Sequence, residues 1–125
     1  MTFSIGVDIE EIATIERLMH EHGEKFLNKV FTDQERSYCL GKPSPIQHLA
    51  ARYASKEATM KALKTGWNNG IQWKHIEVVK ETTEGFPALK LHNKAKEVFD
   101  AQGFSDLDLS FSHSESYVVA TVLFS

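Results

Sequence analysis

The segment from 117 to 124 has the pattern of a β-strand that is apolar on both faces, and this feature constrains the fold more than any other. One face carries Tyr117, Val119 and Leu123, and the other carries Val118, Ala120, Val122 and Phe124. A strand of this kind needs cover on both sides. One small domain spanning residues 1–125 is not expected to supply all of that cover. The pattern therefore favours an oligomer that closes over this strand.

Alternation of apolar and polar residues predicts four more strands. The odd positions between 2 and 9 are apolar, which is typical of a half-buried strand. Residues 107–112 alternate in the same way and lead through a tight turn into the final strand, so the chain should end in a hairpin. A second hairpin is predicted from strands at 71–80 and 88–92, joined by a turn at 83–85.

Apolar residues at helical spacing predict helices between these strands. Two such segments cover 12–19 and 26–30, with Gly23 between them. Residues 32–35 have the spacing of a capping box, in which a threonine hydroxyl and a glutamate carboxylate satisfy each other's backbone donors. The short helix that begins there should end at Gly41.

A longer helix should follow. Ser44 repeats the capping signature, and Pro45 stands at the first helical position, where its missing N–H costs nothing. This helix should continue to about Lys64, and Asn93 is expected to cap a last helix that ends near Gly103. The order of elements predicts an α+β fold in which a mainly antiparallel sheet packs with helices.

The composition excludes several classes of protein. Cys39 is the only cysteine, so neither an intrachain disulfide nor a multi-cysteine zinc site can form, and a reducing cytoplasmic setting is expected. A net charge of −3 argues against nucleic acid held by bulk charge. The longest apolar run is too short to span a membrane, and the acidic first twenty residues do not form a signal peptide.

Asp8 stands near the end of the first predicted strand, on its less apolar face, and two interpretations fit it. Gly6 lies two positions earlier on the same face, and a glycine there lets a phosphate or a metal ion approach the backbone closely. Alternatively, Asp8 and Glu11 have the spacing of a helix N-cap with glutamate at the third helical position. The spacing leaves both interpretations open.

Glu57 falls in the middle of an apolar stripe on the long helix. The stripe is formed by Ile46, Leu49, Ala50, Tyr53, Ala54 and Met60. An isolated buried charge is costly, so the Glu57 carboxylate must be paired, bound to a metal ion or directed into a cleft. The plainest alternative is an ion pair with Lys61, one turn further on. Together with Asp8, Glu57 would suit a hard cation such as Mg²⁺, provided that the two carboxylates meet.

Three other side chains are candidates with plain alternatives. Arg52 and Lys56 lie one turn apart on a flank of the long helix, where they either bracket an anionic group or face solvent. His113 ends a predicted strand, where its role is either structural or catalytic. The chain has no HExxH, GxSxG or Walker-type motif, so a zinc protease, an α/β-hydrolase and a P-loop NTPase lose their main support.

Short motifs follow one another in a specific order along nearly the whole chain. They are Ile5-Gly6-Val7-Asp8-Ile9, Phe31-Thr32-x-x-Glu35, the run from Arg52 to Ala58 with Lys61 and Ala62, Thr65-Gly66, Asn69-Gly70-Ile71, and Ser110-Phe111-Ser112-His113-Ser114 before Tyr117. In this order they resemble the holo-[acyl-carrier-protein] synthase family, the small phosphopantetheinyl transferases.

The resemblance implies a fold, a reaction and an assembly. The fold would be that of a 4′-phosphopantetheinyl transferase. The reaction would transfer the 4′-phosphopantetheine arm of coenzyme A to a serine of apo acyl carrier protein, giving holo acyl carrier protein and adenosine 3′,5′-bisphosphate for fatty acid biosynthesis. The assembly would be a homotrimer with active sites between protomers, which would also cover the second face of the final strand.

The resemblance also implies roles for single residues. Asp8 and Glu57 match the catalytic carboxylates that hold Mg²⁺ against the diphosphate. Lys61 matches a catalytic lysine that contacts phosphate and stabilises charge as the bond breaks. The coenzyme A pocket would be lined by Lys61, Arg52, Gly66 and His113.

Two features of the implied reaction stay open. The base that activates the serine is either Glu57 itself or a water on the metal. Thr14 stands where similar enzymes often carry an arginine that helps to dock the carrier. Arg17, Lys25 and Lys29 are the basic residues that can replace it, because steering depends on a local field.

Two other functions fit the same fold. One is a non-catalytic trimer that binds coenzyme A or another nucleotide. The presence of Asp8, Glu57 and Lys61 argues against it, because a binding module needs neither a metal pair nor the lysine beside it. The other is the same transferase acting on a carrier domain of a larger synthase, which the residues do not distinguish.

Overall fold

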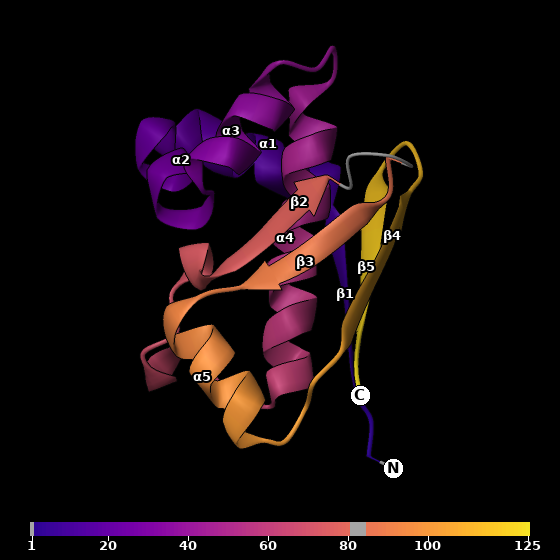
Figure 1. Cartoon of the computed structure of the whole chain (residues 1–125). Coiled ribbons are helices and arrows are strands. Elements are labelled where there is room, and N and C mark those ends of the chain that lie inside the picture. The colour runs from indigo at the N-terminus through magenta and orange to yellow at the C-terminus, as the bar shows by residue number, and fades with distance from the viewer. Residues whose placement is uncertain (1, 81–84) are drawn as a thin grey trace.

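A three-stranded antiparallel sheet forms one side of the molecule, in the order β1-β5-β4 (Figure 1). The computed structural model describes residues 2–80 and 85–125 of the chain. The strands of this sheet are β1 (Ser4–Glu11), β4 (Leu107–His113) and β5 (Tyr117–Phe124). The register places Asp8 of β1 and Phe111 of β4 on either side of Ala120 in β5.

Five α-helices and a second, two-stranded sheet complete the fold. The helices are α1 (Ile12–His22), α2 (Glu24–Val30), α3 (Asp33–Leu40), α4 (Pro45–Leu63) and α5 (Asn93–Ala101). The second sheet pairs β2 (Ile76–Lys80) with β3 (Pro87–Leu91) in antiparallel register. Two 3₁₀ turns, at Trp67–Asn69 and Trp73–His75, connect α4 to β2. The predicted α+β class and antiparallel pairing are confirmed.

Helix α4 is central to the fold because it runs between the two sheets (Figure 1). It packs against the inner face of β1 and β5, where Val118, Ala120, Val122 and Phe124 are fully buried. The helix approaches β1 so closely that a Cβ on Gly6 would lie 1.9 Å from the carbonyl oxygen of Ala58. The glycine therefore makes room for the backbone of α4, and the interpretation that it admits a ligand is wrong.

The apolar side of β1 faces outward, against the expectation of a strand that buries its apolar residues. Ser4, Gly6 and Asp8 point toward α4, and the exposed side of β1 and β5 carries Ile5, Val7, Ile9, Tyr117, Val119 and Leu123. Ile5 and Ile9 are each 64% exposed. One chain therefore covers only one of the two apolar faces of this sheet.

The helix starts agree with the sequence in part. Thr32 and Glu35 form the predicted capping box of α3, and Gly23 separates α1 from α2. Pro45 is the first residue of α4, but Ser44 makes no side-chain cap. The cap predicted for Asp8 and Glu11 is also wrong, because β1 continues to Glu11 and α1 follows it with no side-chain hydrogen bond.

The second hairpin differs from the prediction at both ends. The strand expected over 71–80 begins only at Ile76, because Trp73–His75 form a 3₁₀ turn. Residues 83 and 84 of the predicted turn lie outside the described residues. Asn93 is the first residue of α5, with φ 49°, and His92 rather than Asn93 occupies the cap position.

Among the described residues, no helix is long and apolar enough to cross a membrane.

Candidate functional site

Asp8 and Lys61 come together at the packing contact between β1 and α4. The Lys61 ammonium lies 2.9 Å from Oδ1 of Asp8 and donates a further hydrogen bond, 3.1 Å long, to the carbonyl oxygen of Val7. The hydrogen bond to Asp8 raises the pKa of Lys61. The expected i,i+4 pair of Lys61 with Glu57 is absent from the described ion pairs, because Asp8 takes the lysine.

Glu57 lies beside this pair and receives a hydrogen bond that the sequence did not indicate. The indole N–H of Trp67 donates to Oε1 of Glu57 over 3.3 Å. Burial and the nearby charge of Asp8 raise the pKa of Glu57, while the bond from Trp67 and the charge of Lys61 act against this rise. The buried carboxylate of Asp8 and the partly buried carboxylate of Glu57 therefore influence each other, and the charge of Lys61 acts on both.

A third carboxylate belongs to the same cluster. Burial raises the pKa of Glu10 to about 8, and the neighbouring carboxylates of Asp8 and Glu57 contribute to the rise. Glu10 shares a face of β1 with Asp8, because side chains two residues apart in a strand point the same way. The two-residue spacing of Asp8 and Glu10 could have identified Glu10 from the sequence. The helix-cap interpretation of Asp8 places Glu10 in a helix instead.

The cluster suits a hard cation. Oδ2 of Asp8 is buried and has no hydrogen-bond partner among the described residues, so one carboxylate oxygen of the site is available to a ligand. The same residues contain no group of three or more ligating side chains close enough to hold a metal ion by themselves. Mg²⁺ needs fewer, because it takes one or two carboxylates and completes its shell with waters and substrate phosphates.

Arg52 lies in a second cluster, which is rich in positive charge. Its guanidinium stacks over the ring of Tyr38, 4.6 Å from the ring centroid, and Lys42 and Lys80 approach the same ring at 4.5 and 5.8 Å. Arg52 is 4% exposed, and its Nε has no hydrogen-bond partner among the described residues. This buried donor lines a cavity of about 130 Å³.

Two histidines extend the second cluster. His48 lines the same cavity as Arg52, and burial together with the charges of Arg52 and Lys42 lowers its pKa. His113, at the exposed end of β4, contacts the amide of Gln47 on α4 through Nδ1. The two lysines and Tyr38 were missed from the sequence, because they come from separate elements and form no motif.

Helix α4 separates the two clusters. Lys61 contacts β1 and Arg52 contacts Phe111 of β4, and these strands are the two edges of the sheet. Gly66 is exposed directly after α4, next to Trp67, and so lies on the side of the carboxylates. One chain thus brings Asp8, Glu57 and Lys61 together, and places Arg52 and His113 elsewhere.

Lys56 takes no part in either cluster. Its side chain is fully buried and forms an ion pair of 2.8 Å with the equally buried Glu35. Both interpretations of Lys56, as a solvent-facing residue and as a partner of Arg52 around an anion, are therefore wrong. Arg52 is buried as well, so the interpretation that it faces solvent is also wrong.

A cavity of about 320 Å³ lies between α1, α2 and the aromatic residues behind Glu57. Its lining combines apolar side chains with three basic ones: Leu18, Phe26, Val30, Tyr53, Trp73, His22, Lys25 and Lys29. Tyr53 connects it to the carboxylates, since burial and then Glu57 and Glu10 raise the pKa of this tyrosine to about 12. Of the predicted basic residues, Arg17 is absent from the lining and pairs with Glu21 at 3.5 Å.

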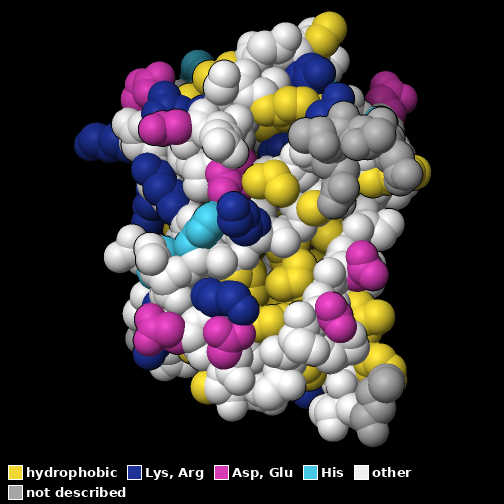
Figure 2. Space-filling view, in the orientation of Figure 1, with side chains coloured by type: hydrophobic (Ala, Val, Ile, Leu, Met, Phe, Trp, Pro, Cys, Tyr) yellow, Lys and Arg dark blue, Asp and Glu magenta, His cyan; other side chains and the backbone are white. Residues whose placement is uncertain are grey.

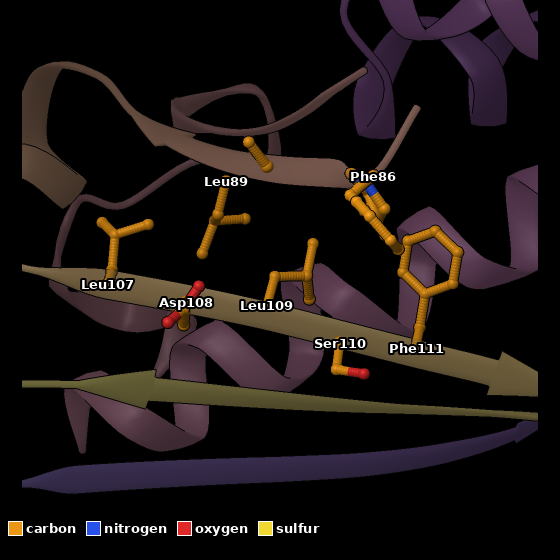
Figure 3. Close-up of a pocket in the computed structure, with 9 residues that line it drawn as sticks. Phe86, Leu89, Leu107, Asp108, Leu109, Ser110 and Phe111 are labelled. Atoms are coloured by element: carbon orange, nitrogen blue, oxygen red, sulfur yellow. The ribbon is translucent and has the colours of Figure 1, made fainter. Parts of the chain in front are cut away.

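A third hollow, of about 670 Å³, lies between strands β3 and β4. Figure 2 shows hydrophobic side chains gathered near the centre of this face. Leu107 and Leu109 point toward β3, whereas Ser110 points away from it (Figure 3). Apolar side chains of the two strands face each other across this hollow, and Asp108 and Ser110 are also among its lining residues.

Comparison with known proteins agrees with this geometry. The family model of the 4′-phosphopantetheinyl transferase superfamily matches residues 4–122. A holo-[acyl-carrier-protein] synthase of Geotalea daltonii is 40% identical over 123 residues, covering 98% of each chain. The corresponding protein of Gloeobacter violaceus is 43% identical over 119 residues, covering 94% of this chain and 89% of its own.

Solved structures give the same result. The crystal structure of holo-[acyl-carrier-protein] synthase from Neisseria meningitidis superposes with a TM-score of 0.87 at 30% identity, covering 98% of this chain and 97% of its own. The Helicobacter pylori enzyme in complex with coenzyme A superposes with a TM-score of 0.81 at 32% identity, covering 97% and 99%. The chain belongs to the holo-[acyl-carrier-protein] synthase family, within the 4′-phosphopantetheinyl transferase superfamily.

Proposed function

We propose that this chain transfers the 4′-phosphopantetheine arm of coenzyme A to a serine of apo acyl carrier protein. The observation that carries the proposal is the cluster of Asp8, Glu57 and Lys61 at the contact of β1 and α4, in a chain whose relatives are holo-[acyl-carrier-protein] synthases. The serine oxygen would bond to the phosphorus that bears the pantetheine, and the bridging P–O bond would break to release adenosine 3′,5′-bisphosphate.

Such a transfer needs positioning and neutralisation of negative charge more than covalent chemistry. Asp8 and Glu57 would hold Mg²⁺, which supplies positive charge to the diphosphate when it is bound. The unpartnered Oδ2 of Asp8 supports this assignment. Lys61 is 54% exposed beside Asp8, so its ammonium can also reach a phosphate oxygen from the solvent side. The serine proton would be accepted either by Glu57 or by a water on the metal ion.

The cationic cluster around Tyr38 is suited to the remaining phosphates of coenzyme A. Arg52 carries a buried, unpartnered N–H, and a guanidinium binds phosphate through a fixed fork of donors. Lys42 and Lys80 add positive charge around it, and the imidazole of His113 can form a hydrogen bond with a phosphate. Since α4 separates this cluster from Asp8 within one chain, we propose a homotrimer in which the two clusters of neighbouring protomers together form each site.

The exposed apolar side of β1 and β5 supports this assembly, and it can be tested directly. Replacing Ile5 with aspartate should leave each chain folded, because Ile5 is 64% exposed. It should dissociate the trimer into monomers and lower transfer in parallel, since a buried isoleucine contributes roughly 1.5–3 kcal/mol. Light scattering and transfer rates measure both. Leu40→Asp, on an exposed residue of α3, is the matched control. A trimer that survives Ile5→Asp contradicts the assembly.

The cavity between α1 and α2 is the proposed docking site for the carrier. Lys25 and Lys29 place positive charge at an apolar hollow next to the carboxylates, where an acidic partner can be steered electrostatically. Thr14 adds no charge there, and Arg17 is paired with Glu21. Lys25 and Lys29 are therefore the better candidates for the basic patch.

The proposed function is tested by the mass of the carrier. Purified chain, coenzyme A, Mg²⁺ and apo acyl carrier protein are mixed, and the intact mass of the carrier is read with and without a chelator. We expect a gain of one phosphopantetheine arm that disappears on chelation. If no arm is gained while coenzyme A still binds, the chain is a binding-only module or acts on a different carrier.

A further inference from the structure

We propose that Trp67 is a positioning residue for this reaction: its indole N–H fixes the Glu57 carboxylate in the orientation that receives the metal ion. The inference rests on the function proposed above, in which Glu57 is a ligand. It adds a residue that the sequence places only in a turn after the long helix.

The contact itself is specific. Nε1 of Trp67 lies 3.3 Å from Oε1 of Glu57, and an indole nitrogen can only donate. A glutamate side chain has several rotatable bonds, and ordering it at the moment of binding costs conformational entropy. A donor that holds one oxygen beforehand reduces that cost and leaves the other oxygen of Glu57 for the cation.

The donor is held in place by a stack of aromatic rings. The ring of Trp67 stacks on Trp73 with 4.1 Å between centroids, and Trp73 stacks in turn on Tyr53 at 5.0 Å. Tyr53 lies one turn before Glu57 on α4, so the stack begins and ends at the same helix. Helix α4 thus holds both ends of this arrangement, since it carries Tyr53 at one end of the stack and Glu57, the acceptor of the Trp67 N–H, at the other.

The middle of the stack is anchored by the buried ion pair. The Lys56 ammonium donates to the backbone oxygen of Trp73 over 3.1 Å and pairs with Glu35 at 2.8 Å. Lys56 and Glu57 are adjacent in sequence but point into different environments, one into the core and the other into the site. The core residue therefore supports the site residue through Trp73 and Trp67.

The test compares two substitutions within one stack. Trp67→Phe keeps an aromatic ring and removes the N–H that reaches Glu57. Trp73→Phe is the matched control, since it removes the other of the two indoles of the chain, whose N–H has no hydrogen bond among the described residues. Trp67→Tyr is a second variant without the indole donor, so that the result does not depend on one substitution folding.

The readout is binding of Mn²⁺ in the presence of coenzyme A, measured by the loss of the free Mn²⁺ signal in electron paramagnetic resonance. We expect Trp67→Phe to weaken Mn²⁺ binding about 3- to 10-fold, the effect of one hydrogen bond. Trp73→Phe should remain within about twofold of the unsubstituted chain. Thermal unfolding verifies that each variant is folded.

Two outcomes would contradict the positioning role of Trp67 while leaving the proposed function intact. Unchanged Mn²⁺ affinity in Trp67→Phe shows that the indole N–H does not position Glu57. Equal weakening in Trp67→Phe and Trp73→Phe shows that ring packing matters and the donor does not. If the unsubstituted chain fails to bind Mn²⁺ with coenzyme A, the proposed metal site fails, and the positioning role fails with it. Binding by the unsubstituted chain therefore separates the two failures.

Discussion

Replacing Glu57 with glutamine should nearly abolish transfer while leaving the fold intact. Glutamine has the same shape and can still accept the hydrogen bond from Trp67, but it carries no negative charge to bind Mg²⁺. Losing one preorganised electrostatic contact of this kind lowers kcat by roughly 10²–10³-fold. The rate of holo-carrier formation at saturating coenzyme A measures the loss, and chemical unfolding measures the stability.

The fold should tolerate this change because the charge of Glu57 is not required for folding. Burial and the charge of Asp8 already raise the pKa of Glu57, so the charged form is disfavoured in its present surroundings. Glu97→Gln is the matched control, since Glu97 is an exposed carboxylate on α5, away from the carboxylate cluster and from the outer face of the sheet. Near-normal transfer by Glu57→Gln would contradict the assignment and direct attention to Glu10, the third carboxylate of the cluster.

Much of the fold could be predicted from the sequence because its signals are local. The capping box at Thr32, the proline at the start of α4 and the alternation in β4 each depend on neighbours a few residues away. The strand predicted for the stretch before β2 is wrong, because the structure of this stretch depends on a residue that is distant in sequence. Its apolar residues suit a strand, but Lys56, distant in sequence, binds the backbone oxygens of Trp73 and Ile76 and accompanies a 3₁₀ turn there.

The direction that β1 faces could not be predicted. A period of two shows which residues share a face, but not which face the chain covers with its own helix. Ile5 and Ile9 look like core residues, whereas α4 covers the side of Gly6 and Asp8. This reversal brings Asp8 to Lys61. The same limit explains the wrong pairing of Lys61 with Glu57, because an i,i+4 rule contains no information about a strand that lies against the helix.

The burial of Lys56 could not be predicted from the sequence either. A charged residue on the flank of a helix is normally solvated, and only a partner elsewhere in the chain can make its burial tolerable. That partner is Glu35, whose second role as the capping-box residue of α3 concealed it. The residues that support the candidate site could not be found from motifs, since supporting contacts join elements that are distant in sequence.

Replacing Lys56 with methionine should cause a larger loss of stability than any other single substitution proposed for this chain. It removes the partner of a fully buried carboxylate, 2.8 Å away, and the donor to the backbone oxygens of Trp73 and Ile76. Breaking one side of a buried pair costs about 3–5 kcal/mol, because it leaves an uncompensated charge. Chemical unfolding should show this decrease in the free energy of unfolding.

Lys96→Met is the matched control, because Lys96 and Asp100 form an equally short ion pair of 2.7 Å with about half of each side chain exposed. Its loss should cost no more than about 1 kcal/mol, since solvent screens such pairs. The double variant Glu35→Gln with Lys56→Met removes both buried charges and should recover part of the stability lost in Lys56→Met. The recovery is partial, because the backbone N–H groups of Thr32 and Val78 donate to different oxygens of Glu35, and the amide of a glutamine keeps only one of these two acceptors. If the double variant is no more stable than Lys56→Met, the uncompensated charge is not the cause, and the lost bonds to Trp73 and Ile76 carry the stabilisation instead.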